Sequence, residues 1–470
     1  MKYVAYLVTA LLLGSSVAAE EPNDLDEPPP YKLFRAEEDY SYLANDESQR
    51  YQDDWFDRLK YIPLDADGDV YLTVGGELRP RFEHFSKRNW TAAGDKDFYS
   101  QRISVHVNVR FGRRFRIFSE LYHGYNGGEK EFAQFDELDW HQGFAELISH
   151  LPGSGQFSLR LGRQELAFGA ARLVGIREGP NIRRSFDAAQ AIYAIHGTTV
   201  KAFFGREVRP EFYIFDNDFV LFDGDSGNPE LWGLYSQFRI PGDIGPMEAY
   251  YLGFQTGSAR FNDVAGKESR HSVGIRRFGK IGKHWIYNTE LIYQFGDLAG
   301  QDIRAFNIET DWHYEFVKTR WRPSLGLKLE LTSGDDREGD GEVNSFNPMF
   351  VNPAYYSLAT TITPVNMKSI HPSLTLRPTA KLILYFEWAK FWRESKNDGL
   401  YSPPRFLARD GVGVSESEIG NQLGVKVGYE IGRHMSFDLD VSYFIAGDFL
   451  EATGESENIL HIAPTFSFKF

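Results

Sequence analysis

The sequence has no cysteine and no long hydrophobic run beyond its first 20 residues. Without cysteine there can be no disulfide, zinc–thiolate site or thiol nucleophile. A membrane-spanning helix needs roughly 20 consecutive apolar residues, and the mean hydropathy of -0.41 agrees with their absence. Positive charge is also scarce, since 51 Lys and Arg face 66 Asp and Glu. These shortages exclude a helical membrane protein and argue against nucleic acid as a partner, because a nucleic-acid binder needs a basic surface.

The first residues carry an export signal. Lys2 precedes an apolar run from Val4 to Leu13, and small residues follow as far as Ala19. This layout predicts a secretory signal peptide over residues 1–19. Residues 20–69, which begin with an acidic, proline-rich stretch, are predicted to form a short N-terminal periplasmic segment with a short helix at 54–59.

Aromatic residues and glycine are abundant, with 38 Phe, 25 Tyr, 9 Trp and 44 Gly. An exported chain with a polar average is either a soluble protein or a transmembrane β-barrel, whose lumen-facing residues keep the average polar. The aromatic content favours the barrel, because such barrels carry a lipid-facing apolar band flanked by aromatic girdles.

From Tyr71 onward, apolar and polar residues alternate with a period of two, which is typical of strands with one polar face. In the first two predicted strands, the lumen should receive Glu77, Arg79, Arg81, His106, Asn108 and Arg110, and lipid should receive Val105, Val107 and Val109.

A soluble sandwich also alternates, so the connections decide between the two folds. Eight short links, such as 112–114 and 432–434, alternate with longer links such as 168–187 and 334–367. Short periplasmic turns opposite long outer loops are typical of outer-membrane barrels. The sequence therefore predicts an all-β fold, a transmembrane antiparallel up-and-down barrel of about 18 strands over residues 70–470.

The last predicted strand carries Phe466, Phe468 and Phe470 on one face. A terminal aromatic on an amphipathic strand resembles the signal that the barrel-assembly machinery recognises, although an ordinary edge strand has the same pattern. The machinery and outer-membrane lipid are thus expected partners.

Arginine is concentrated between Leu161 and Asp187. Guanidinium groups stay charged and present forked donors that match carboxylates, so an inward-folded loop of this composition would select anions or bind sugar acids. The alternative is that these arginines brace the barrel by pairing with Glu165, Glu178 and Asp187. The candidate lumen and selectivity residues are Arg79, Arg81, Arg110, Arg163, Arg172, Arg177, Arg183, Arg184 and Arg393.

Several blocks resemble the alginate export porin family of Gram-negative outer membranes. The clearest are GRQELAFG and ARLVGIREGPNIRRSFD between 162 and 187, and others include SFNPMF at 345–350, HPSLTLRP at 371–378 and WAKFWRESKNDGLY at 388–401. The resemblance implies an outer-membrane location and passage of a polyuronate through an arginine-lined lumen. Arg163 and Arg393 match arginines of the family's Gly-Arg-Gln and Phe-Trp-Arg blocks. The sequence resembles the broad branch of the family rather than the dedicated alginate secretin, and that branch includes pores of unknown solute.

Other functional signals are weak. Asp65, Asp67 and Asp69 lack the spacing of a calcium loop, and the acidic tip from Asp335 to Glu342 is typical of a solvated loop, so we predict no metal site and no cofactor. We hypothesise a passive porin for a polar, anionic, carbohydrate-like solute such as alginate or uronate oligomers. The alternatives are a general small-solute uptake porin and an outer-membrane lipid hydrolase, for which no nucleophile motif appears. The N-terminal segment is too short for a large plug domain.

Overall fold

The structure is a computed structural model. It describes residues 29–44, 54–127, 130–224, 227–240, 245–352, 354, 359 and 361–470. The predicted signal peptide lies outside these residues, as does most of the acidic, proline-rich stretch that follows it. Within them, no helix is long and apolar enough to cross a membrane.

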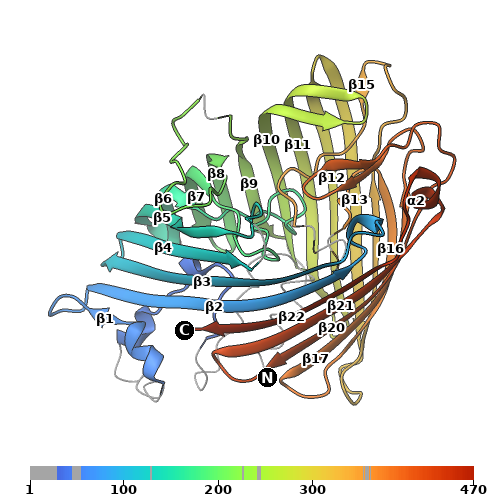
Figure 1. The fold of residues 1–470 in the computed structure, drawn as a ribbon. Coiled ribbons are helices and arrows are strands. Elements are labelled where there is room, and N and C mark those ends of the chain that lie inside the picture. Colours follow the sequence, from blue (N-terminus) through green and yellow to red (C-terminus); the bar gives the residue numbers. More distant parts are fainter. Residues whose placement is uncertain are drawn as a thin grey trace.

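Eighteen long strands of the described chain form one closed antiparallel sheet, shown in Figure 1. Each strand pairs with its neighbours along the chain, and the first pairs with the last to close the wall. This arrangement confirms the predicted all-β barrel of about 18 strands. In order, the strands are β2 (Val70–Ser86), β3 (Lys96–Phe111), β4 (Phe115–Asn126), β5 (Asp136–Leu151), β6 (Gly155–Gln164), β7 (Phe186–Ile195), β8 (Thr198–Glu207), β9 (Glu230–Arg239), β10 (Pro246–Phe261), β11 (Val264–Ile281), β12 (Trp285–Leu298), β13 (Gln301–Glu315), β14 (Ser324–Thr332), β16 (Met367–Leu376), β17 (Leu382–Arg393), β20 (Glu418–Glu430), β21 (Met435–Ala446) and β22 (Ile459–Lys469).

Short strands and helical segments lie at the ends of the barrel. β1 (Ile62–Pro63) pairs with the start of β2, β15 (Glu342–Val343) pairs with β13, and β18 (Leu400–Ser402) pairs with β19 (Phe406–Arg409). The described helical segments are η1 (Arg35–Glu37), η2 (Ser41–Ala44), η4 (Trp55–Leu59), η5 (Arg88–Trp90), η6 (Pro152–Ser154) and α2 (Asp448–Thr453). The helix η4, capped by the Asp54 side chain, is the short helix predicted at 54–59.

The two faces of the wall follow the period-two pattern. Val105 and Val107 of β3 are 45% and 37% exposed on the outside. His106 and Asn108, which alternate with these valines, are buried. Successive side chains of a strand point to opposite faces, so this single register settles the orientation of the whole strand. The predicted lipid-facing valines and lumen-facing polar residues are therefore confirmed in β3.

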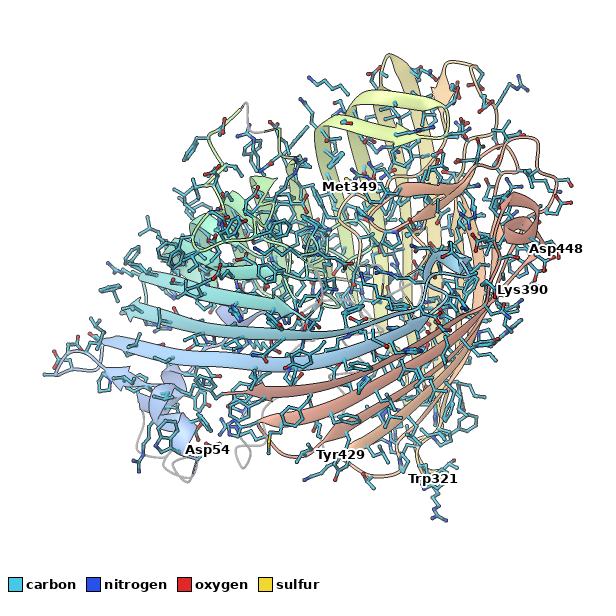
Figure 2. The ribbon with its side chains drawn as sticks, viewed as in Figure 1. Asp54, Trp321, Met349, Lys390, Tyr429 and Asp448 are labelled. Carbon is cyan, nitrogen blue, oxygen red and sulfur yellow. The ribbon has the colours of Figure 1, made fainter. Side chains whose placement is uncertain are left out.

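The links differ at the two ends of the barrel. All eight short links predicted from the sequence connect consecutive strands at one end, for example 112–114 between β3 and β4. The other end carries the long links, together with two tight hairpins at 262–263 and 299–300. In Figure 2, the labelled Trp321 lies at the short-turn end, while Met349, from a long loop, lies within the barrel.

The C-terminus completes the closing seam. The backbone of Phe470 exchanges two hydrogen bonds with Gly76 of β2, at 3.0 and 3.1 Å. A side chain at Gly76 would meet the Phe470 ring at 2.8 Å, so glycine is needed for this close approach. Phe56 of η4 contacts the ring of Phe468 edge-on and the ring of Phe470 at a tilt, at ring-centroid distances of 5.6 and 5.3 Å.

We expect that deletion of Phe470, or Phe470→Asp, will lower the amount of barrel in the outer membrane. Either change removes the ring at the seam, and the deletion also removes the last pair of backbone hydrogen bonds. Surface labelling and heat-modifiable mobility of the folded barrel would measure the loss. Phe470→Tyr keeps the ring and should assemble normally, and equal levels in all variants would contradict this role.

Candidate functional site

A loop between β6 and β7, residues 165–185, folds into the barrel, and we call it the constriction loop. On one wall, Arg79 of β2 donates to the carbonyls of Glu178 at 2.7 Å and Pro180 at 2.9 Å. Arg102 of β3 donates to the Asn181 carbonyl at 2.7 Å. The wall arginines thus hold the backbone of the loop tip.

The same loop reaches the opposite wall. Arg172 forms ion pairs with Glu290 of β12 and with Glu309 of β13, the latter at 2.6 Å. β12 and β13 lie ten strands from β2 and β3 around the barrel, close to the far side. The constriction loop therefore crosses the lumen, as the sequence hypothesis of an inward fold requires.

A second long loop, 333–366, meets the constriction loop inside. Phe350 pairs with Val174 through a parallel bridge and donates its N–H to the Leu173 carbonyl at 2.8 Å. The Asn347 side chain donates to Glu268 of β11 at 3.0 Å. Apolar side chains from both loops pack together against the inner face of β7–β13. The two loops consequently narrow the lumen as one joined structure.

Glu178 is the charged centre of the constriction. Its carboxylate accepts from Arg102 at 3.0 Å, lies 3.4 Å from Arg79 and pairs with Arg183. Burial alone would raise the pKa of Glu178, but Arg102, Arg183 and Arg79 hold it well below its ordinary value. Three guanidinium groups therefore surround the carboxylate of Glu178, although Arg102 also pairs with Glu77 at 3.3 Å, and the excess of cations favours a positive local field.

Glu165 adds a group that titrates near neutral pH. It lies 2.9 Å from His141 Nε2 and 3.5 Å from Arg183. Burial raises the pKa of Glu165 to about 7, against the opposing effect of Arg183. Its carboxyl group is therefore ionised above about pH 7 and neutral below it.

We expect the preference for anions to rise as the pH falls from about 8 to about 6, because protonation of Glu165 removes one negative charge from the constriction. Reversal potentials across a salt gradient in planar bilayers would measure this change. Glu165→Gln should already show the preference of the acidic form and lose most of its pH dependence. An unchanged pH profile in that variant would show that other groups are responsible.

The other inward candidates brace the structure. Arg81 lies 3.0 Å from Glu83, and Arg110 lies 3.6 Å from Asp39 of the N-terminal segment. Arg184 pairs with Glu207 at 2.8 Å and donates to the Gly175 carbonyl.

Arg177 and Arg393 differ from these ion pairs. Arg177 donates to the Ile182 carbonyl, and its guanidinium carbon lies 5.1 Å from the centre of the Phe132 ring. Arg393 is fully buried and donates to five backbone carbonyls of the loop between β17 and β20, so it holds that loop together.

Arg163 does not line the lumen, contrary to the sequence hypothesis. It follows Leu159 and Leu161 on the outward face of β6, where those leucines are about half exposed. Its partner across the strand pair is Asp187, at 2.8 Å, and the carbonyl of Asp218 accepts from it at 2.6 Å. The loop between β8 and β9 thus buries this ion pair against the outer wall.

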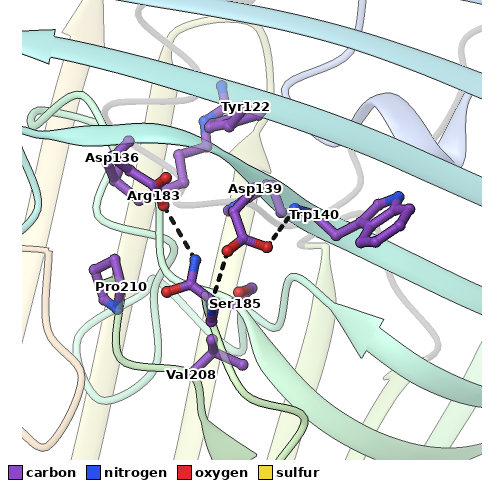
Figure 3. Close-up of a pocket in the computed structure, with 11 residues that line it drawn as sticks. Tyr122, Asp136, Asp139, Trp140, Arg183, Ser185, Val208 and Pro210 are labelled. Carbon is purple, nitrogen blue, oxygen red and sulfur yellow. Dashed lines mark hydrogen bonds between the residues drawn. The ribbon is translucent and has the colours of Figure 1, made fainter. Parts of the chain in front are cut away.

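The same loop forms the pocket in Figure 3, at the rim near β5. Asn217 donates its backbone N–H to Asp139 at 2.8 Å and its side-chain amide to Asp136 at 3.1 Å. Arg183 and Val208 also line this pocket. Through these hydrogen bonds the loop is attached to β5 of the wall at this pocket.

Sequence reasoning missed five inward arginines on strands as selectivity candidates, namely Arg102, Arg116, Arg160, Arg270 and Arg276. The signal was present, because Arg102 shares the phase of His106, and Arg160 alternates with Leu159 and Leu161. The prediction gave more weight to the many arginines of the loop than to the strand phase.

The comparisons agree with the fold. The family model described as "Alginate export" matches residues 70–459. The chain belongs to the alginate export family. Membership confirms the resemblance seen in the sequence and identifies the chain as a porin-type barrel of the Gram-negative outer membrane.

Solved porin structures share the fold at low sequence identity. Pseudomonas aeruginosa OpdO has a TM-score of 0.57 and 10% identity, covering 85% of this chain and 97% of its own. P. aeruginosa OccK2 (OpdF) in complex with glucuronate has a TM-score of 0.55 and 13% identity, covering 87% and 98%. A BenF-like porin from Pseudomonas fluorescens Pf-5 has a TM-score of 0.56 and 12% identity, covering 85% and 99%. No match was found among curated proteins.

Proposed function

We propose that this barrel is a passive pore for a polar, anionic, carbohydrate-like solute such as uronate or alginate oligomers. The observation that carries the proposal is the basic wall on β2–β6. Below the rim, its inward charged side chains are Arg79, Arg81, Arg102, Arg110, Arg116 and Arg160, against Glu77, Glu83, Glu120 and Glu146. Fixed positive charge in a confined, poorly screened path favours anions even in a chain that is acidic overall.

The facing wall on β10–β14 has the opposite character. Its inward carboxylates are Glu248, Glu268, Glu290, Glu309, Asp311, Glu315 and Glu330, against Arg270, Arg276 and Lys328. Several of the cations on this side are neutralised, as in the Arg276–Glu248 pair at 2.9 Å. The resulting field across the lumen would orient a solute that carries carboxylates on one edge and hydroxyls on the other.

The glucuronate complex of OccK2 concerns that protein alone, but it shows that a barrel of similar fold can hold a sugar acid. Together with the basic wall, it supports a uronate as the solute of this barrel. A general uptake porin would pass small neutral and anionic solutes alike.

Planar bilayers test the proposal. Purified barrel should conduct ions, prefer chloride over potassium at about 0.1 M salt, where the screening length is about 10 Å, and be blocked by galacturonate trimers. The neutral trisaccharide maltotriose serves as the control and should block far less. A cation preference, or equal block by both sugars, would overturn the proposal.

A serine, a histidine and a carboxylate lie together inside the lumen, and they bear on the hydrolase alternative. Ser369 Oγ lies 2.9 Å from His371 Nε2, and Glu387 lies 3.4 Å from His371. All three residues are buried, and Ser369 Oγ also lies 3.4 Å from the carboxylate of Glu330. A carboxylate beside the serine would oppose the negative charge that develops on the oxygen of the tetrahedral intermediate in ester hydrolysis. This cluster therefore favours a polar network in the barrel wall over a lipid hydrolase.

A further inference from the structure

Residues 29–44 of the N-terminal segment enter the barrel, and we call this stretch the N-terminal strap. Ala36 is buried against Phe118 and Phe144, whose side chains point inward from β4 and β5. Arg35 donates to the carbonyls of Gly76 and Phe470 at the closing seam, at 3.1 and 2.8 Å. The strap is too short for a plug domain, yet it occupies part of the lumen near the short-turn end.

The strap also touches the constriction. Arg183 of the constriction loop donates to the Leu33 carbonyl at 3.2 Å. A movement of the strap would therefore change a contact of the constriction loop. The strap joins the seam, the basic wall and the constriction loop.

Opposite the strap, two strands present arginines to one point. Arg116 of β4 and Arg160 of β6 share the carboxylate of Glu146, at 2.6 and 3.1 Å. Both guanidinium groups lie over the Phe144 ring, at 5.3 and 4.6 Å from its centre, which restricts their orientation. Lys201 of β8 acts electrostatically on the same region. Glu146 is thus one wall carboxylate shared by two arginines.

The strap supplies the missing acceptors. Glu37 pairs with Arg160 at 2.9 Å, and the Ala36 carbonyl accepts from Arg116 at 2.6 Å. Arg160 lowers the pKa of Glu37 far below its usual range, with help from Arg116 and Lys201 and against the effect of burial. The Glu37 side chain is nevertheless 51% exposed. Water and solute in the lumen can therefore reach the bound carboxylate.

We propose that Arg116 and Arg160 form a carboxylate-binding site in the lumen, which Glu37 occupies as a built-in ligand until a solute carboxylate displaces it. The chemistry fits a uronate, because two oriented guanidinium groups present forked donors that recognise a carboxylate. This inference rests on the proposed function as an anion-selective pore. It adds the place where the solute binds and the residue with which it competes.

The first test is the block of single-channel current by galacturonate trimers. Glu37→Gln vacates the site while keeping the size of the side chain, so the concentration for half-block should fall about tenfold. Asp39→Asn is the matched control, because Asp39 is a similarly exposed strap carboxylate that faces Arg110 instead. Arg160→Gln combined with Glu37→Gln should cancel the gain. Equal shifts in the Glu37 and Asp39 variants, or no shift with Glu37→Gln, would overturn the site.

The second test follows the strap itself. Since the sequence has no cysteine, Ala36→Cys places a single thiol at a position that is 4% exposed. Galacturonate trimers should raise its labelling rate with a charged maleimide, whereas maltotriose should not. Uronate block without increased labelling would place the solute elsewhere and overturn the displacement. Absence of anion preference and of uronate block in every variant would instead refute the proposed function.

Discussion

Val107→Arg is expected to prevent most of the chain from assembling as a barrel. Val107 faces outward, four residues from the end of β3, where the exposed ring of Phe111 marks the membrane interface. An arginine on the lipid face near the bilayer midplane costs about 2–4 kcal/mol. That is a large part of the stability of a typical domain, about 5–15 kcal/mol.

Two controls separate charge from size and lipid from lumen. Val107→Leu keeps the position apolar and should assemble normally. Ser436→Arg introduces the same side chain on the inward face of β21, where water and Asp438 are available, and should also assemble. Unfolding in urea within lipid vesicles would measure the difference. A Val107→Arg barrel as stable as the Ser436→Arg barrel would contradict the assigned orientation of the wall.

Glu178→Gln is expected to produce the largest change in selectivity. Glu178 is the carboxylate shared by Arg79, Arg102 and Arg183, so its neutralisation leaves three guanidinium groups with less compensation. A unit charge at about 8 Å contributes about 2 kcal/mol at an effective dielectric constant of about 20. Partial screening by lumen water reduces this, and we expect the ratio of anion to cation permeability to rise at least about threefold at low salt.

Arg177→Gln is the comparison of opposite sign. The described contacts of Arg177 are the Ile182 carbonyl and the Phe132 ring, so its charge can be removed without breaking the Glu178 cluster. The permeability ratio should fall while conductance is kept. Arg183→Gln, in contrast, would break contacts to Glu178, Glu165 and Leu33, and should loosen the loop as well. If Glu178→Gln and Arg177→Gln left ion preference unchanged at low salt, selection would not reside in the constriction loop.

The strands could be predicted from the sequence because their period-two pattern depends only on neighbouring residues along the chain. Leu159, Arg160 and Leu161 alternate in the sequence as they do across the wall. The same rule, carried two residues further, places Arg163 outward. The prediction failed there because a family motif and a local concentration of arginine were given more weight than the strand phase.

The partners of the loop arginines were not readable. Arg172 pairs with Glu290 and Glu309, which are 118 and 137 positions away along the chain. Many lumen carboxylates share the same strand phase, and no local pattern selects among them. The sequence left two roles open for the named arginines, selection of solute and bracing of the barrel. The contacts show that most of them at least brace the structure.

The sequence by itself determined the barrel, its orientation of faces, its short and long links and its family, because strand periodicity, turn length and recurrent motifs are local properties. Only the tertiary structure decided that the constriction loop meets a second loop across the lumen, that the loop between β8 and β9 covers Arg163 and that the N-terminal strap enters the basic site. These features depend on which distant groups meet when the sheet closes. Closure brings β2 against β22 and creates an interior in which every charged group must find a partner, and that pairing has no counterpart in the order of residues along the chain.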